Sequence, residues 1–117
     1  MTNKLKIDYV EFPAFDLEQI KTFYTMTFGW TFQDFGSEYC AFNDGNIDGG
    51  FFHSELSSNT SNGAALIVLY SDNLESTRDL IEKNGGDILK KIFTFPGGRR
   101  FHFKDPVGNE LAVWSDK

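Results

Sequence analysis

The sequence predicts an α+β fold in which two βαβββ modules pair, forming a curved, cup-like mixed sheet with the helices on its outer face. Two observations predict it. In each half of the 117-residue chain, strand-like alternation precedes a stretch with helical spacing, and two or three more strand-like stretches follow. The pattern also repeats, because Leu17 and Gly29 recur as Leu74 and Gly86, 57 positions later.

The first half begins with a strand and a helix. Residues 7–12 alternate between apolar and polar side chains, Asp16 is suited to cap a helix, and Gly29 is suited to end it. Between them, apolar residues from Leu17 to Phe28 fall close to one helical face. The remaining strands of this half are expected at residues 31–35, 38–42 and 50–54.

The second half repeats this order. Residues 65–70 (ALIVLY) predict a strand, Asp72 or Asn73 can cap the next helix, and the glycines at 85–86 end it. Strands are expected at 87–93, 99–103 and 109–114, the last two joined by a tight D-P-V-G-N turn. We therefore expect one domain over residues 1–117, with module 1 at about 5–54, a polar linker at 55–63 and module 2 at about 64–115.

The composition excludes several classes of protein. With 17 acidic and 11 basic residues the net charge is -6, which argues against nucleic-acid binding because phosphate contacts need lysine and arginine. A single cysteine excludes an internal disulfide, and no apolar run approaches the roughly 20 residues that span a bilayer. Thirteen phenylalanines can fill a core and line a pocket. We expect a cytoplasmic protein with a small-molecule partner.

Two segments resemble the glyoxalase/bleomycin resistance protein/dioxygenase group, the vicinal oxygen chelate superfamily. They are IDYVEFPAFDLEQIKTFYTMTFGW at 7–30, with its D-L-E helix start and F-G-W, and FHFKDPVGNELAVW at 101–114, with its D-P-x-G-N turn. The resemblance implies either a metal-dependent enzyme or a metal-free protein that sequesters a drug, so it does not fix the function. It also implies a homodimer, because members often complete their cups at a two-fold interface.

The resemblance places the family's metal ligands on the first and last strands of each module. Those positions correspond here to Tyr9, Leu66, Ala112 and, within one residue, His53. Three of the four cannot bind a metal, and one histidine cannot hold a catalytic ion that needs about three protein ligands. We therefore expect no cofactor and no metal.

A second hypothesis keeps a metal. Carboxylates two residues away on the same strand face could rebuild a site, which makes the protein a divalent-metal lyase or isomerase of the glyoxalase I type. The candidate ligands are Glu11, His53, His102 and Glu110.

The pocket walls follow from the two-residue period of strands. By this period the expected ligand-binding residues are Tyr9, Glu11, Leu66, Val68, Arg100, His102, Ala112 and Trp114, and the resemblance adds His53. Arg100 can either fix an anionic group of an aromatic or anionic ligand or pair with Glu11 or Glu110 across the sheet. His102 and Glu11 are the candidate catalytic groups, since an imidazole can act as a base near neutral pH.

Overall fold

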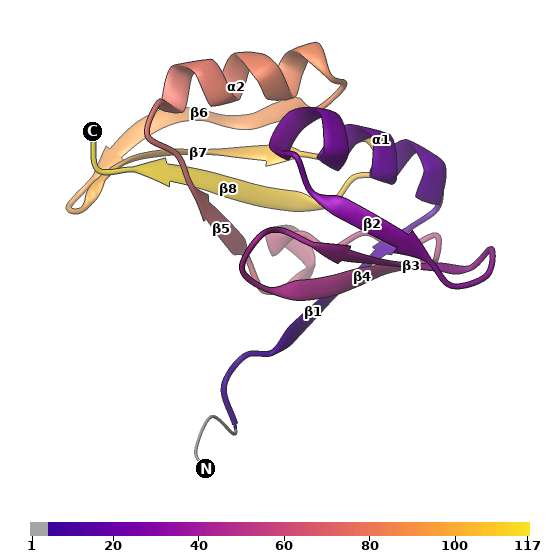
Figure 1. Cartoon of the computed structure of the whole chain (residues 1–117). Coiled ribbons are helices and arrows are strands. Elements are labelled where there is room, and N and C mark those ends of the chain that lie inside the picture. Colours follow the sequence, from indigo (N-terminus) through magenta and orange to yellow (C-terminus); the bar gives the residue numbers. More distant parts are fainter. Residues whose placement is uncertain (1–4) are drawn as a thin grey trace.

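The computed structural model describes residues 5–117, and each module folds as a strand, a helix and three more strands (Figure 1). Module 1 contains β1 (Tyr9–Ala14), α1 (Leu17–Phe28), β2 (Thr31–Asp34), β3 (Tyr39–Asn43) and β4 (Asp48–His53). Module 2 contains β5 (Ile67–Tyr70), α2 (Leu74–Lys83), β6 (Asp87–Phe95), β7 (Gly98–Lys104) and β8 (Glu110–Ser115). A short 3-10 turn, η1 (Thr60–Asn62), lies in the linker.

The helix ends follow from local side-chain chemistry. The carboxylate of Asp16 accepts a hydrogen bond from the backbone N–H of Gln19, which has no partner within the helix. Gly29 ends α1 with a left-handed φ of 75°. Asn73, and not Asp72, caps α2. After α2 the left-handed residue is Gly85, with a φ of 104°.

The strands form two four-stranded sheets, in the orders β1-β4-β3-β2 and β5-β8-β7-β6. In each sheet the first strand runs parallel to the last one of its module, and the other pairs are antiparallel. Both helices lie on the same side of the sheets (Figure 1). The predicted α+β fold of two βαβββ modules is therefore confirmed, with β1 and β5 each at an edge of its own sheet.

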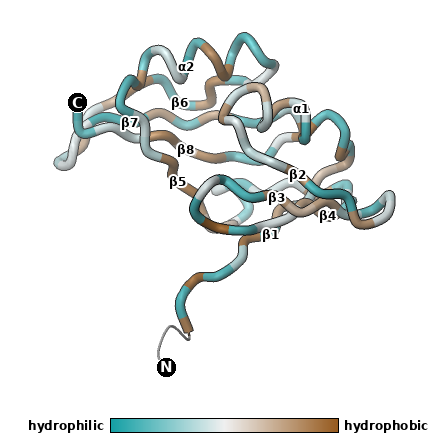
Figure 2. The backbone as a smooth tube through the Cα atoms, viewed as in Figure 1, coloured by the Kyte–Doolittle hydropathy of each residue, from teal (hydrophilic) through white to brown (hydrophobic). Residues whose placement is uncertain are grey.

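Alternation along the strands separates a core face from a concave face. Figure 2 shows hydrophobic and hydrophilic residues alternating along the strands and along α2. The strand side chains that face the helices belong to one buried cluster to which both modules contribute, including Phe12, Phe42, Phe51, Phe101, Phe103, Leu111 and Val113. Most of the phenylalanines thus belong to the core, and the face away from the helices is left to polar and larger aromatic side chains.

The structure also places the single cysteine and gives the lengths of the helices. Cys40 is fully buried in the core, and burial raises the pKa of its thiol. Within residues 5–117, no helix is long and apolar enough to cross a bilayer.

The D-P-V-G-N turn between β7 and β8 is bonded to α1 through Asp105. One carboxylate oxygen accepts the backbone N–H groups of Val107 and Asn109, each at 3.0 Å. The other accepts the phenol of Tyr24, from α1, at 2.8 Å. Burial raises the pKa of Asp105 to about 6, although these hydrogen bonds act in the opposite direction.

Asn109 extends the same turn to two more segments. Its Nδ2 donates to the carbonyl of Pro13 in β1, and its Oδ1 accepts the backbone N–H of Ser58 in the linker, both at 2.8 Å. The Asn109 side chain is fully buried, so no water replaces these bonds if they are lost. One amide therefore holds the first strand and the linker against module 2.

We expect Asn109→Ala to lower the free energy of unfolding by about 2–4 kcal/mol, because it leaves the buried carbonyl of Pro13 and the partly buried N–H of Ser58 without partners. Urea denaturation measures the change. The matched control is Asn46→Ala in the exposed turn before β4, which should change stability by less than about 0.5 kcal/mol. Equal effects of the two substitutions would contradict a joining role for Asn109.

Candidate functional site

The concave face of module 2 carries a row of functional side chains on three neighbouring strands. The register pairs Val68 with Ala112 and Ala112 with His102, and it pairs Trp114 with both Tyr70 and Arg100. These residues lie on the face predicted from the two-residue period of the strands. The row has a rigid base because all its residues lie on the neighbouring strands β5, β8 and β7.

A chain of hydrogen bonds links Glu110, His102 and Arg100. Nδ1 of His102 lies 2.8 Å from Oε2 of Glu110, and Nε2 lies 2.8 Å from Nη2 of Arg100. His102 is 3% exposed and Glu110 is 2% exposed, so both lie away from water. Buried polar groups of this kind fix one geometry when all of them are bonded.

The proton positions in this chain follow from the partners. A guanidinium only donates, so Nε2 of His102 must accept, and the ring proton sits on Nδ1 and points to Glu110. The ring is therefore neutral and oriented at both nitrogens. Burial raises the pKa of Glu110, but hydrogen bonds from His102 and Thr60 outweigh burial and lower it overall.

Thr60, in the linker, completes the chain at its other end. Its backbone N–H and its hydroxyl both donate to Oε1 of Glu110, each at 2.8 Å. The backbone N–H of Glu110 donates to the carbonyl of Ser58, also at 2.8 Å. The linker thus fixes the carboxylate of Glu110. This carboxylate orients His102, and His102 in turn orients Arg100.

Arg100 lies against aromatic rings and uses few of its donors. Its guanidinium carbon is 5.6 Å from the ring centre of Phe93 and 5.9 Å from that of Phe95. Within residues 5–117, the bond to His102 is the only one that its guanidinium makes, and the buried Nε has no acceptor. The aromatic rings hold the cation in place while most of its N–H groups stay free for another acceptor.

A hollow of about 320 Å³ opens beside Arg100. Its other lining residues are Val68, Phe95, Gly97 and Trp114. The ring of Phe95 packs edge-on against Trp114, with centroids 6.2 Å apart. The hollow therefore combines flat apolar walls with one cation at its side.

A larger hollow, of about 390 Å³, runs along the free edge of β5 beside Trp30. Asp44 there accepts two backbone N–H groups of its own turn, the hydroxyls of Ser71 and Thr77 bond to each other, and the hydroxyl of Tyr70 donates to Asp72 and Asp116. We place the site beside Arg100 because that hollow contains donors that the chain leaves unused.

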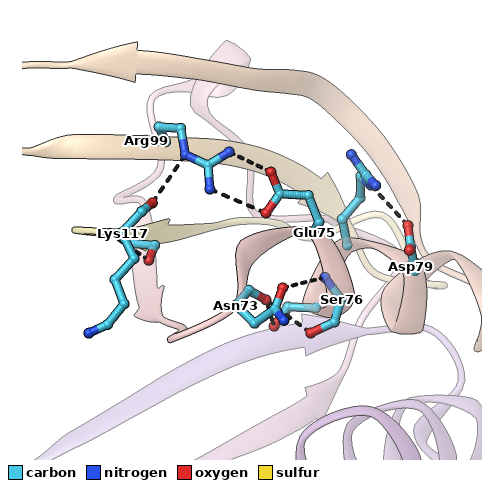
Figure 3. A network of polar contacts seen from close by, with 9 residues as sticks. Asn73, Glu75, Ser76, Asp79, Arg99 and Lys117 are labelled. Carbon is cyan, nitrogen blue, oxygen red and sulfur yellow. Dashed lines mark hydrogen bonds and ion pairs between the residues drawn. The ribbon is translucent and has the colours of Figure 1, made fainter.

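The neighbouring cation Arg99 points to the opposite face. Its guanidinium forms an ion pair with Glu75 in α2, and its Nε donates to the carbonyl of Lys117 (Figure 3). The ion pair with Arg99 lowers the pKa of Glu75 to about 2. Lys90 and Lys91 are exposed on β6. Of the adjacent arginines, only Arg100 reaches the concave face.

The concave face of module 1 carries a different group of residues. The phenol of Tyr39 donates to Oε2 of Glu11 at 2.9 Å, so Tyr9 supplies the proton of its 2.6 Å bond to Tyr39. Partial burial and these two hydrogen bonds raise the pKa of Tyr39, which stays a neutral donor. Gly50 makes room for this arrangement, because a Cβ there would collide with the hydroxyl oxygen of Tyr39.

His53 does not join the predicted site. In β4 the buried core residue Phe51 faces the helices, and His53, two residues on, lies on that same face. There it sits beside Glu38, with Nδ1 and Oε1 3.4 Å apart. Placing His53 among the pocket walls is therefore wrong by one position along the strand.

The other predicted walls differ in their access to a ligand. Leu66 is half-buried and precedes β5, while Ala112 is fully buried between Val68 and His102. Sequence reasoning missed Phe93, Phe95 and Thr60 altogether. Phe93 and Phe95 were missed because β6 shifts its register, so a strict two-residue alternation does not predict their face. No periodic pattern identifies Thr60.

The alternative metal site is not assembled. His102 and Glu110 touch, but their ring nitrogens and carboxylate oxygens already bond to Arg100, to each other and to Thr60. Glu11 belongs to the tyrosine group of module 1. Between residues 5 and 117, no group of three or more His, Cys, Asp or Glu side chains lies close enough together to hold a metal ion.

The comparisons with known proteins agree on the family and the fold. The model of the Glyoxalase/Bleomycin resistance protein/Dioxygenase superfamily matches residues 6–113. A family enzyme from Burkholderia phytofirmans PsJN is 16% identical, with a TM-score of 0.79 over 95% of this chain and 100% of that one. A glyoxalase-related enzyme from Fulvimarina pelagi is 15% identical, with a TM-score of 0.79 over 95% and 88%.

A third similar structure is a glyoxalase/bleomycin resistance protein from Albidiferax ferrireducens T118. It is 15% identical, with a TM-score of 0.72 over 93% of this chain and 97% of that one. At such identities the likeness is one of fold. No curated protein matches the sequence.

We expect nitrogen-15 NMR of the native protein at pH 7.5 to show His102 as a neutral ring protonated at Nδ1. In Glu110→Gln the carboxamide can donate as well as accept, so this preference for Nδ1 should weaken, while Arg100 still requires Nε2 to accept. His53 is the internal control, because it has no contact with Glu110. A ring protonated at Nε2 in the native protein would contradict the hydrogen-bond chain.

Proposed function

Because the chain belongs to the glyoxalase/bleomycin resistance protein/dioxygenase superfamily, we propose that it binds a small, flat, anionic molecule in module 2 without the help of a metal. The ligand's ring lies in the hollow between Val68, Phe95 and Trp114. Its carboxylate or phosphonate bonds to Arg100. The protein sequesters or carries this molecule.

The observation that supports this proposal most strongly is that the guanidinium of Arg100 uses few of its hydrogen-bond donors. A guanidinium has five N–H donors, and within residues 5–117 one hydrogen bond to His102 is its only protein contact of this kind. An anion supplies the missing acceptors, and such charge-assisted bonds are about twice as strong as neutral ones. The aromatic walls beside the cation favour a ring attached to that anion.

The same geometry supports binding over catalysis. His102 was a candidate base, but its Nε2 lone pair is held by Arg100 and its ring is 3% exposed. A general base must reach the proton that it removes. We therefore assign His102 a positioning role, which is to hold Arg100 at the side of the hollow.

Phenylphosphonate is a suitable probe, with benzyl alcohol as its uncharged counterpart. We expect phenylphosphonate to shift the indole N–H signal of Trp114 in NMR titrations and to raise the thermal midpoint, since it binds only the folded chain. Arg100→Gln should weaken this binding by at least about tenfold, the effect of losing a charged hydrogen bond. Added chelator should change nothing.

Arg99→Gln is the matched control, because it removes the same charge from the adjacent residue on the opposite face. It should leave the affinity within about twofold. The proposal fails if both substitutions weaken binding equally, which would indicate diffuse attraction, or if benzyl alcohol binds as well as phenylphosphonate.

We also propose that two copies associate through the free edges of β1 and β5, because an unpaired strand edge can pair with a strand of a second chain. Pairing at these edges leaves the concave faces of both modules open to ligands. Native mass spectrometry with added nickel, zinc and manganese should show a dimer without a tightly held ion. A monomer would refute the association, and one ion per chain would refute metal-independent binding.

A further inference from the structure

The concave face of module 1 presents a carboxylate with an unused oxygen. Tyr39 bonds to Oε2 of Glu11, but within residues 5–117 Oε1 has neither a hydrogen bond nor a cation beside it. The bond between Tyr9 and Tyr39 keeps both phenols beside this carboxylate. Glu11 is therefore held in one orientation and remains open to a positively charged partner.

Aromatic rings flank this carboxylate. Tyr9 is 43% exposed and Phe52 is 38% exposed, and the register places Phe52 opposite the half-buried Tyr39. All three side chains lie on the concave face. Exposed ring faces next to a carboxylate attract cations, because the negative face of each ring adds to the negative charge.

The charge of the whole chain is concentrated in this module. Residues 5–54 contain eight acidic side chains and two basic ones, whereas residues 64–115 contain seven of each. The net charge of module 1 is therefore -6, the value for the entire protein. Such a field raises the local concentration of cations near module 1.

We propose that Tyr9, Glu11, Tyr39 and Phe52 form a second site, which binds the ammonium group of a small organic cation. A carboxylate supplies the opposite charge, and the rings replace the water that an alkylated ammonium binds weakly. A metal ion fits poorly there, because Glu11 is the one carboxylate of the group and a bound ion needs several ligands. This site shares no residue with the hollow beside Arg100 and does not depend on it.

Choline and its uncharged isostere 3,3-dimethyl-1-butanol test the proposal. In NMR titrations, choline should shift the ring signals of Tyr9 and Tyr39 in a saturable way, and the aromatic rings should move its N-methyl signal upfield. The isostere, with the same shape and no charge, should bind at least about fivefold more weakly. Phenylphosphonate, the probe for the other hollow, should leave these tyrosine signals unchanged.

Glu11→Gln should weaken choline binding by at least about fivefold. Glu55→Gln is its matched control, because it removes one charge from an exposed residue of the linker. An equal effect of both variants would overturn the site and leave only general attraction to an acidic protein. Equal binding of choline and its isostere, or shifts that never saturate, would overturn it as well.

Discussion

The structure depends on the D-P-V-G-N turn between β7 and β8, because one short loop is bonded to three separate parts of the chain. Asp105 accepts the phenol of Tyr24 from α1, and Asn109 bonds to Pro13 in β1 and to Ser58 in the linker. The bonds to Tyr24 and Pro13 are buried and the bond to Ser58 is partly buried, so water cannot readily replace them in the folded chain. The turn also fixes where β8 begins.

The start of β8 in turn sets the geometry of the candidate site. Glu110 is the first residue of this strand, and it bonds at once to the linker and to His102. His102 in turn positions Arg100 through the hydrogen bond to its guanidinium. The position of the guanidinium thus depends on contacts that begin in the linker between the two modules.

The sequence predicts the fold and most of the concave face, because both follow from short-range periodicity. The repeat at 57 positions and the helix caps predict the order of the elements, and the alternation in β7 and β8 predicts the strand face on which Arg100, His102 and Trp114 lie. Bonding partners cannot be predicted in the same way, since Thr60 and Glu110 are 50 residues apart and meet only in three dimensions. Phe93 escapes prediction because β6 shifts its register twice, and a one-residue error places His53 on the wrong face.

The uneven distribution of charge gives the folded chain an electric dipole between its halves. Residues 5–54 carry the whole net charge and residues 64–115 carry none. Near a positively charged surface, such as an anion-exchange matrix, the molecule turns module 1 toward the surface and holds module 2 away from it. When the chain is immobilised in this way, the surface covers the tyrosine group of module 1. The hollow beside Arg100 stays open to solution.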